Sequence, residues 1–213
     1  MTEASIRPAI VARALRLEYL TVGWNVVEGT IGVWAALAAG SVALMGFGID
    51  SFIESTSGAV LVWRLLSERH AGDRAAVDRL DRIAQRLVGG SLFLLAAYVA
   101  GDALWTLWSR ERPQPTPVGI LLTALSMVVM VWLARAKRRA AADLDSRALA
   151  ADAFQTTACF WLSLVALGGM ALYAVTGWWW ADPVAALGMT WFLVREGRET
   201  WRGEECCSDC TVG

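Results

Sequence analysis

The amino-acid sequence predicts an all-α, polytopic membrane protein with six transmembrane helices and both termini in the cytoplasm. Of its 213 residues, 56% are hydrophobic and 18% are charged, whereas a soluble domain carries about 45–50% apolar and about 25% charged residues. Six mostly apolar stretches are each about 20 residues long, the length that crosses a bilayer as a helix. The net charge of -1 gives no indication of a nucleic-acid partner.

Three of the connections between the predicted spans are short, at Gly40-Ser41, Pro113–Pro117 and Thr176–Trp179, and the other two are longer and charged. The polar segment Ser67–Gln85 favours a helix and is expected to extend the third span into the cytoplasm. Residues 1–13 contain no apolar core of a signal peptide, so the first span is expected to be retained. In chain order the predicted spans are Leu15–Ala39, Val42–Leu66, Arg86–Trp108, Val118–Ala136, Leu149–Val175 and Trp180–Glu196.

The distribution of basic residues predicts how the chain lies in the membrane. Lys and Arg concentrate on the cytoplasmic side of membrane proteins. All of the 19 basic residues except Arg110 and Arg112 lie at or beyond one set of span ends, the set that includes both termini. Both termini are therefore expected in the cytoplasm, in a multi-pass protein of the inner (plasma) membrane. Trp178–Trp180 fit an aromatic belt at the outer surface.

Five carboxylates are interpreted as lying deep in the predicted spans, where an ionisable side chain costs about 2.5–3.5 kcal/mol on insertion scales and usually marks a pathway. Asp50 and Glu54 are four residues apart, so they share one face of the second span, near the middle of the bilayer. Two carboxylates this close in a low dielectric repel unless a proton or cation lies between them. We therefore interpret Asp50 and Glu54 as metal ligands. The five residues are Glu28, Asp50, Glu54, Asp102 and Asp152.

The fifth predicted span offers further ligands, because Gln155 and Cys159 are also four residues apart. The second and fifth spans run in opposite directions, so packing would place Asp50 level with Cys159 and Glu54 level with Gln155. Four side chains would then surround one ion, and tetrahedral coordination by carboxylate and thiolate suits Zn²⁺.

Three more polar residues are expected near this ion as outer-shell or proton-coupling groups: Glu28, Asn25 one turn before it, and Asp152 on the cytoplasmic side of Gln155. For Glu28, an ordinary structural hydrogen bond is the alternative interpretation.

The predicted domain organisation is a six-helix transport domain over residues 1–203 and a Cys-rich cytoplasmic tail over residues 204–213. Cys206, Cys207 and Cys210 are too close together for a structural disulfide framework, and in a reducing cytoplasm they favour metal capture. A tail with incidental cysteines is the alternative.

Three stretches of the sequence resemble motifs of a known family. Gly40–Leu44 followed by Asp50–Glu54 resembles the start of that family's second helix, where two ligands are separated by three residues. Ala151–Gln155 resembles its fifth-helix A-D-A-x-H signature, and Ala181–Gly188 resembles the opening of its sixth helix. On these motifs the chain resembles the cation diffusion facilitator (cation efflux) family of metal/proton antiporters, over roughly residues 15–200.

The sequence also departs from the family pattern. Gln155 and Cys159 stand where the family usually has His or Asp and then Asp, and Glu54 replaces the more usual Asp. The histidine-rich loop of many zinc members is missing, since His70 is the only histidine. The family's C-terminal cytoplasmic domain is not expected after residue 203, so the resemblance is to a short, divergent branch.

The resemblance implies a secondary transporter, not an enzyme, that exports a divalent metal ion in exchange for protons, with Zn²⁺ favoured as the substrate. It also implies a homodimer in the lipid bilayer that alternates between inward- and outward-open states. Two other interpretations stay open: transport of another divalent metal such as Fe²⁺, Mn²⁺ or Cd²⁺, and a non-transporting membrane sensor or assembly protein that binds metal. A membrane enzyme is disfavoured, because the sequence shows no nucleophile with a base, no H-E-x-x-H and no phosphate-binding loop.

Overall fold

The computed structural model describes residues 3–39, 42–68, 74–110 and 117–202, and these residues form six α-helices and no strand. The predicted all-α class and the predicted set of helices are confirmed. The helices are α1 (Glu3–Ala39), α2 (Val42–Glu68), α3 (Arg74–Ser109), α4 (Pro117–Leu144), α5 (Arg147–Thr176) and α6 (Ala181–Arg202).

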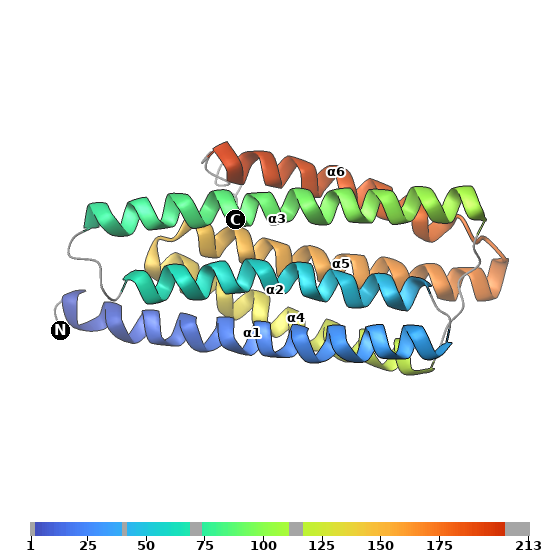
Figure 1. Cartoon of the computed structure of the whole chain (residues 1–213), viewed down its shortest axis with the longest axis horizontal. Helices are drawn as coiled ribbons and strands as arrows, with labels where there is room; N and C mark the ends of the chain where they lie inside the picture. Colours follow the sequence, from blue (N-terminus) through green and yellow to red (C-terminus); the bar gives the residue numbers. More distant parts are fainter. Residues whose placement is uncertain (1–2, 40–41, 69–73, 111–116, 203–213) are drawn as a thin grey trace, which may run out of the picture.

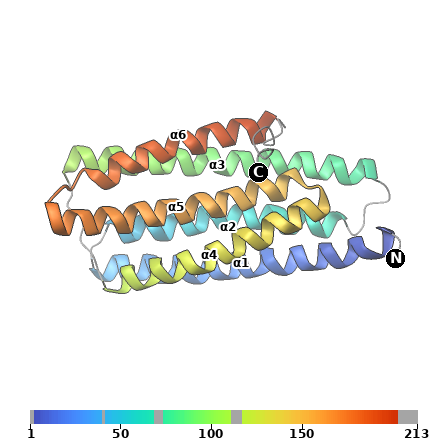
Figure 2. The same cartoon turned by 180° about the vertical axis from the view of Figure 1, so that it is seen from behind.

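The six helices run side by side along one axis and alternate in direction (Figures 1 and 2). α1, α3 and α5 begin at the same end of the bundle, toward which α2, α4 and α6 run. We call this the basic end, because Arg7, Arg64, Arg74, Arg147 and Arg202 lie in the corresponding terminal parts of the helices. The first and last helices therefore start and finish on the same side, as the predicted topology requires.

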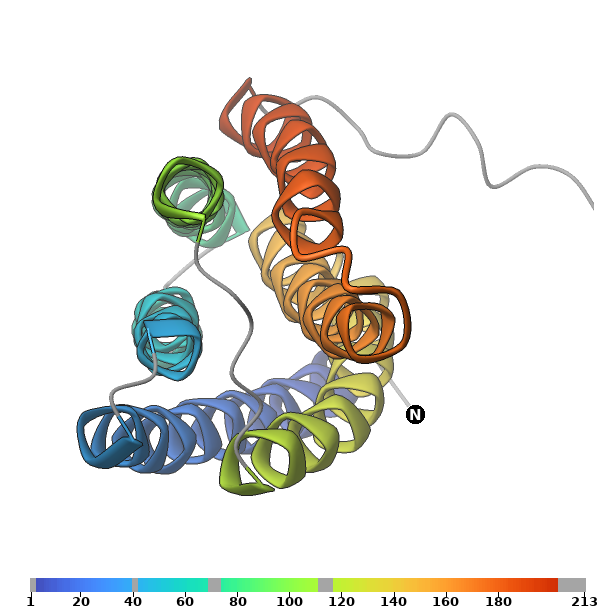
Figure 3. The ribbon, with the colours of Figure 1, turned by 90° about the vertical axis from the view of Figure 1, so that its right-hand side faces the viewer.

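Helices adjacent in the chain are not always the closest neighbours in space. The most extensive contacts join α1 to α2, α3 to α6 and α4 to α5. Viewed along the bundle axis, α1 and α4 lie on one side, α3 and α6 on the other, and α2 and α5 between them (Figure 3). α2 and α5 contact each other, which is the pairing that the predicted metal site needs.

Three of the described helices are long and apolar enough to cross a membrane by length and composition: α3, α4 and the Arg147–Tyr173 part of α5. α2 also has the length to cross a membrane, and Asp50, Glu54 and four hydroxyl side chains fall between its residues 50 and 57. Of these polar residues, Asp50 and Glu54 are the predicted metal ligands.

Three helices extend further than expected, and one of them is α6, which ends at Arg202 instead of Glu196. α1 begins at Glu3 instead of Leu15, since Val11 and Ala14 on one face are buried in the apolar core. α4 continues to Leu144 instead of Ala136, for the same reason. The predicted helical extension of the third span is confirmed from Arg74 onward.

The predicted long, charged connection between the fourth and fifth spans is wrong. α4 and α5 are joined by Asp145 and Ser146 alone. Asp145 adopts φ 52, and the amides of Asp145 and Ser146 bond back to Ala142 O at 3.3 Å and Ala141 O at 3.0 Å, which closes the end of α4. Ser146 then caps α5 by accepting a hydrogen bond from Leu149 N.

Candidate metal site

One face of α2 carries the two carboxylates predicted to bind metal. Glu54 is 1% exposed, and Asp50 lies one turn before it on the same face. The Oδ1 atom of Asp50 and both carboxylate oxygens of Glu54 are buried without a hydrogen-bond partner in the described part of the chain. A buried polar atom without a partner is costly, so this pair favours the approach of a cation or proton.

The inner face of α1 lines the same region with polar side chains spaced alternately three and four residues apart. These buried residues are Glu18, Thr21, Asn25 and Glu28. Asn25 lies beside the Glu54 carboxylate. Glu28 lies next to Ser126 of α4 and close enough to the α2 carboxylates for direct electrostatic interaction. The structure therefore brings Asn25 and Glu28 to the predicted ligands, and their outer-shell or proton-coupling roles stay predictions.

α5 places Cys159 against both carboxylates of α2. The thiol is 1% exposed, so among the described residues it is the free cysteine, held inside the bundle. Thr156, one turn earlier on α5, lies beside Glu54. Thr156 is not among the predicted site residues, although its spacing of three residues from Cys159 puts the two on neighbouring positions of one face.

Gln155 makes a different contact from the one expected. Its Oε1 atom accepts a hydrogen bond of 2.9 Å from the hydroxyl of Ser91 on α3. The carboxamide oxygen is therefore engaged with α3, while Nε2 is buried without a hydrogen-bond partner among the described residues. As a metal ligand, Gln155 would have to exchange this bond for the ion.

A close approach of two backbones holds α1 and α2 together at the level of the carboxylates. A Cβ atom on Gly29 would lie 3.0 Å from Gly48 O, and one on Gly48 would lie 2.9 Å from Val33 N and 3.0 Å from Gly29 O. Neither position has room for a side chain, because the neighbouring atoms are backbone. Gly48 thus brings the backbone of α2, two residues before Asp50, against the backbone of α1 at Gly29 and Val33.

Nevertheless, the described residues contain no group of three His, Cys, Asp or Glu side chains arranged so that they could hold a metal ion. Asp50, Glu54 and Cys159 are neighbours without being a finished coordination shell. The side chains would have to close on an incoming ion.

A second charged cluster, which the sequence analysis missed, lies close to Glu54. The ammonium of Lys137 on α4 pairs with Asp152 of α5 and, at 3.1 Å, with Glu18 of α1. Ser57 of α2 donates a hydrogen bond to the other oxygen of Asp152. Asp152, predicted as an outer-shell group of the metal, is thus the partner of a buried lysine that had been assigned to a cytoplasmic connection.

The spacing of buried residues on α4 was the signal that would have found Lys137. Met130, Leu133, Lys137, Ala140 and Leu144 recur every three or four residues and are all buried. Lys137 stands at a core position of this stripe.

The comparison with known proteins covers part or all of each of the six helices. The family model described as the cation efflux transmembrane domain matches residues 20–202. The chain belongs to the cation efflux family. The resemblance inferred from the motifs of the second, fifth and sixth helices is thereby confirmed.

Two curated relatives of this cation efflux protein are transporters by name. The chain is 28% identical over 190 residues to an uncharacterized transporter of Synechocystis, covering 86% of this chain and 60% of that protein. It is 25% identical over 170 residues to the cation-efflux pump FieF of Shewanella oneidensis, covering 74% of this chain and 54% of that protein. The chain therefore spans less than two thirds of the length of either relative.

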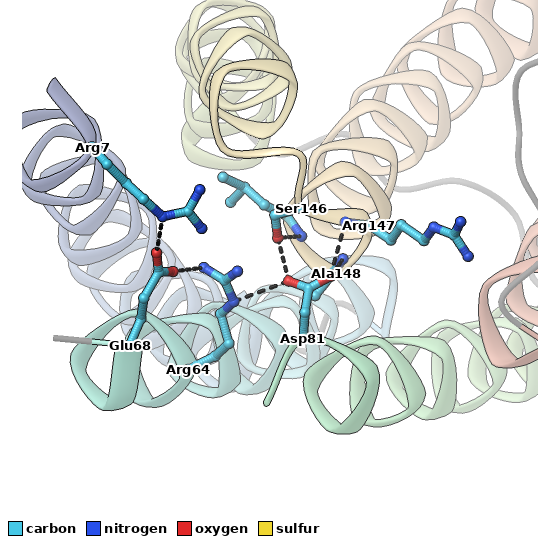
Figure 4. A network of polar contacts seen from close by, with 8 residues as sticks. Arg7, Arg64, Glu68, Asp81, Ser146, Arg147 and Ala148 are labelled. Atoms are coloured by element: carbon cyan, nitrogen blue, oxygen red, sulfur yellow. Dashed lines mark hydrogen bonds and ion pairs between the residues drawn. The ribbon is translucent and has the colours of Figure 1, made fainter. Parts of the chain in front are cut away.

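The basic end of the cation efflux bundle is tied together by a chain of ion pairs (Figure 4). Arg64, 1% exposed, bridges Glu68 at 2.6 Å and Asp81 at 2.9 Å. Arg7 of α1 contacts Glu68 at 2.7 Å. The guanidinium groups thus link α1, α2 and α3.

Asp81 extends this network to α5. Its carboxylate accepts hydrogen bonds from the Ser146 hydroxyl at 2.5 Å, from Arg147 N at 3.0 Å and from Ala148 N at 3.4 Å (Figure 4). A carboxylate at the first amides of a helix satisfies donors that have no partner within the helix and complements the helix dipole. Asp81 therefore fixes the start of the helix that carries Cys159.

The predicted metal-capturing tail lies outside the described residues. This applies to Cys206, Cys207 and Cys210, and to the domain boundary at residue 203. Their roles stay predictions.

Proposed function

We propose that this cation efflux protein carries a divalent transition metal ion across the plasma membrane in exchange for protons, with Zn²⁺ as the favoured substrate. The observation that supports it most directly is the Asp50–Glu54 pair, whose buried oxygens have no hydrogen-bond partner in the described part of the chain. A divalent ion between them would remove both the repulsion and the desolvation cost.

Cys159 supports a transition metal over Mg²⁺ or Ca²⁺, which bind oxygen ligands. A thiolate with two carboxylates suits Zn²⁺ or Cd²⁺, and Gln155 could complete a tetrahedral shell by releasing Ser91. The four proposed ligands come from α2 and α5, which contact each other at the centre of the bundle.

Metal binding at these residues would release protons, because a coordinating thiol is deprotonated and a protonated carboxyl must ionise to bind. The same reaction in reverse expels the metal as protons return. Competition between proton and metal for one set of ligands thus couples the two fluxes when the site alternates between the two sides of the membrane. We also propose that the protein works as a homodimer that alternates between inward- and outward-open states, as its family resemblance implies.

The test is metal flux into proteoliposomes with an imposed pH gradient, measured for Zn²⁺, Cd²⁺, Mn²⁺ and Fe²⁺. Asp50→Asn should lower Zn²⁺ flux at least about tenfold, since loss of even an outer-shell partner costs about 10–100-fold in metal sites. Asp143→Asn, an exposed change of the same kind near the end of α4, is the matched control and should transport like the wild type.

Flux of the wild-type size from Asp50→Asn would overturn the assigned site. Zn²⁺ binding by the wild type without flux of any metal would overturn transport and leave a metal-sensing role. Flux that does not acidify or alkalinise the lumen in step with metal would overturn proton exchange.

A further inference from the structure

The side chain of Lys137 is surrounded by oxygen atoms of the kind that bind metal cations. Lys137, Glu18 and Asp152 are each 0% exposed. The ammonium lies between carboxylates from α1 and α5, and the Ser57 hydroxyl of α2 bonds to Asp152. Four helices therefore each contribute one polar group to a single buried point.

The charges of this cluster do not balance internally. Two carboxylates face one ammonium, and Glu54 stands close enough to interact with Lys137 as well. Neither oxygen of Glu18 has a hydrogen-bond partner among the described residues, although Oε2 is ion-paired with Lys137 at 3.1 Å. The ammonium is thus the group that makes burial of both acids tolerable, since an uncompensated buried charge costs several kcal/mol.

The cluster lies between the candidate metal site and the basic end. Ser57 follows Glu54 by one turn on α2, in the direction of the basic end. Gly58 lets α1 approach, since a Cβ there would lie 2.7 Å from Val22 Cγ2, and it would also contact Glu18 Oε2 at 3.5 Å. The next two positions on this face of α2 toward the basic end are Leu61 and Leu65, and both are fully buried in the apolar core.

We propose that Lys137 is a tethered cation that fills a second, oxygen-lined cation site built from Glu18, Asp152 and Ser57. Its ammonium takes the position that a second divalent ion would otherwise hold. The transport site at Asp50 and Glu54 is thereby left as the single exchangeable site among the residues that the structure describes. This assignment of the first site rests on the proposed function, whereas the second site is inferred from its own contacts.

The donors define the ion that the vacated site would take. Two carboxylates and a hydroxyl are hard oxygen ligands, which suit Mn²⁺ or Mg²⁺ better than soft metals. Removing the ammonium leaves Glu18 and Asp152 facing each other at low dielectric, and two such carboxylates bind a cation or share a proton.

The experiment counts bound Mn²⁺ per chain on the purified full chain in detergent at pH 8, by titration calorimetry and elemental analysis. Lys137→Met should bind one more Mn²⁺ than the wild type. Lys137→Arg, which keeps the cation, should match the wild type. Lys137→Met combined with Asp152→Asn should lose the additional ion, because one of its two carboxylates is gone.

An Asp50→Asn background separates this proposal from the proposed function. Asp50→Asn/Lys137→Met should bind one Mn²⁺ where Asp50→Asn binds none, whether or not the wild type binds Mn²⁺ at the first site. Equal stoichiometry in the wild type and in folded Lys137→Met overturns the second site, whatever the first site does.

Lys137→Gln is the second variant in case Lys137→Met does not fold. If neither is monodisperse, solubilisation in Mn²⁺ at a free concentration well above the dissociation constant of the site should recover folded protein from both, because an ion that binds only the folded chain stabilises it by mass action. Recovery supports the site, and no recovery overturns it, because a latent ion site must be stabilised by its ion.

Discussion

Replacing Asp81 with alanine should destabilise the basic end of the bundle far more than its place near the surface suggests. The change removes the acceptor for the Ser146 hydroxyl and for two backbone amides of α5, and it removes one of the two acidic partners of Arg64. Arg64 keeps Glu68 at 2.6 Å, so its charge is not left alone.

The size of the effect follows from these contacts. Loss of the helix cap is worth about 1 kcal/mol, loss of the charge-assisted bond from Ser146 about 1.5 kcal/mol, and loss of the partly buried ion pair about 1 kcal/mol. The combined loss is roughly 3.5 kcal/mol, and at about 2–4 °C per kcal/mol for a chain of this size the melting midpoint should fall by roughly 7–14 °C.

The assay is thermal unfolding in detergent followed by tryptophan fluorescence, since the chain has 12 Trp residues. Asp81→Asn keeps an oxygen acceptor but loses the charge, so its midpoint should fall by about half as much. Asp78→Ala, exposed and one turn earlier on α3, is the matched control and should stay within about 2 °C of the wild type. Equal midpoints for Asp81→Ala and Asp78→Ala would refute the reasoning.

Three further predictions concern the centre of the bundle. Gly48→Ala should lower the melting midpoint by several degrees, because overpacking against backbone costs about 1–3 kcal/mol. The control Gly23→Ala, with nothing within 4 Å of its new Cβ, should leave the midpoint unchanged. Equal midpoints for the two variants would contradict the close approach of α1 and α2. Cys159→Asp should shift transport from Cd²⁺ toward Mn²⁺ in a competition assay, and an unchanged ratio would mean that the thiol only packs. Glu28→Gln should flatten the pH dependence of flux more than it weakens metal affinity, and an effect on neither would reduce Glu28 to a structural role.

The predicted ligands on α2 were accessible from sequence because a helix imposes its own geometry. Asp50 and Glu54 are four residues apart, so their common face needs no knowledge of the rest of the fold. Which helix packs against these carboxylates depends on the tertiary structure, which local spacing does not give. Here the family motif on α5 pointed to Cys159, which the structure places beside both carboxylates.

The misses have two physical origins, charged residues near span ends and contacts between distant parts of the chain. Counting every Lys and Arg near a span end as a loop charge assigned Lys137 to the cytoplasm, although its spacing from Leu133 and Ala140 marks a core position. Glu18 was overlooked because it lies near the start of the first predicted span, where a charged side chain is expected to reach water. The partner of Gln155 was beyond reach of any local pattern, since Ser91 lies 64 residues away in the chain.

The two-residue turn between α4 and α5 has a consequence for how this protein enters the membrane. α4 alone would bring the charge of Lys137 toward the apolar phase without compensation, at a cost of about 2.5–3.5 kcal/mol on insertion scales. Asp152 follows only 15 residues later, and the tight turn brings it alongside as soon as α5 folds back. The two opposite charges can therefore neutralise each other within one helical hairpin, with little loop-closure entropy, before α1 delivers Glu18. We expect α4 and α5 to be inserted together, because the helical hairpin is the smallest unit in which Asp152 compensates the charge of Lys137 in the apolar phase.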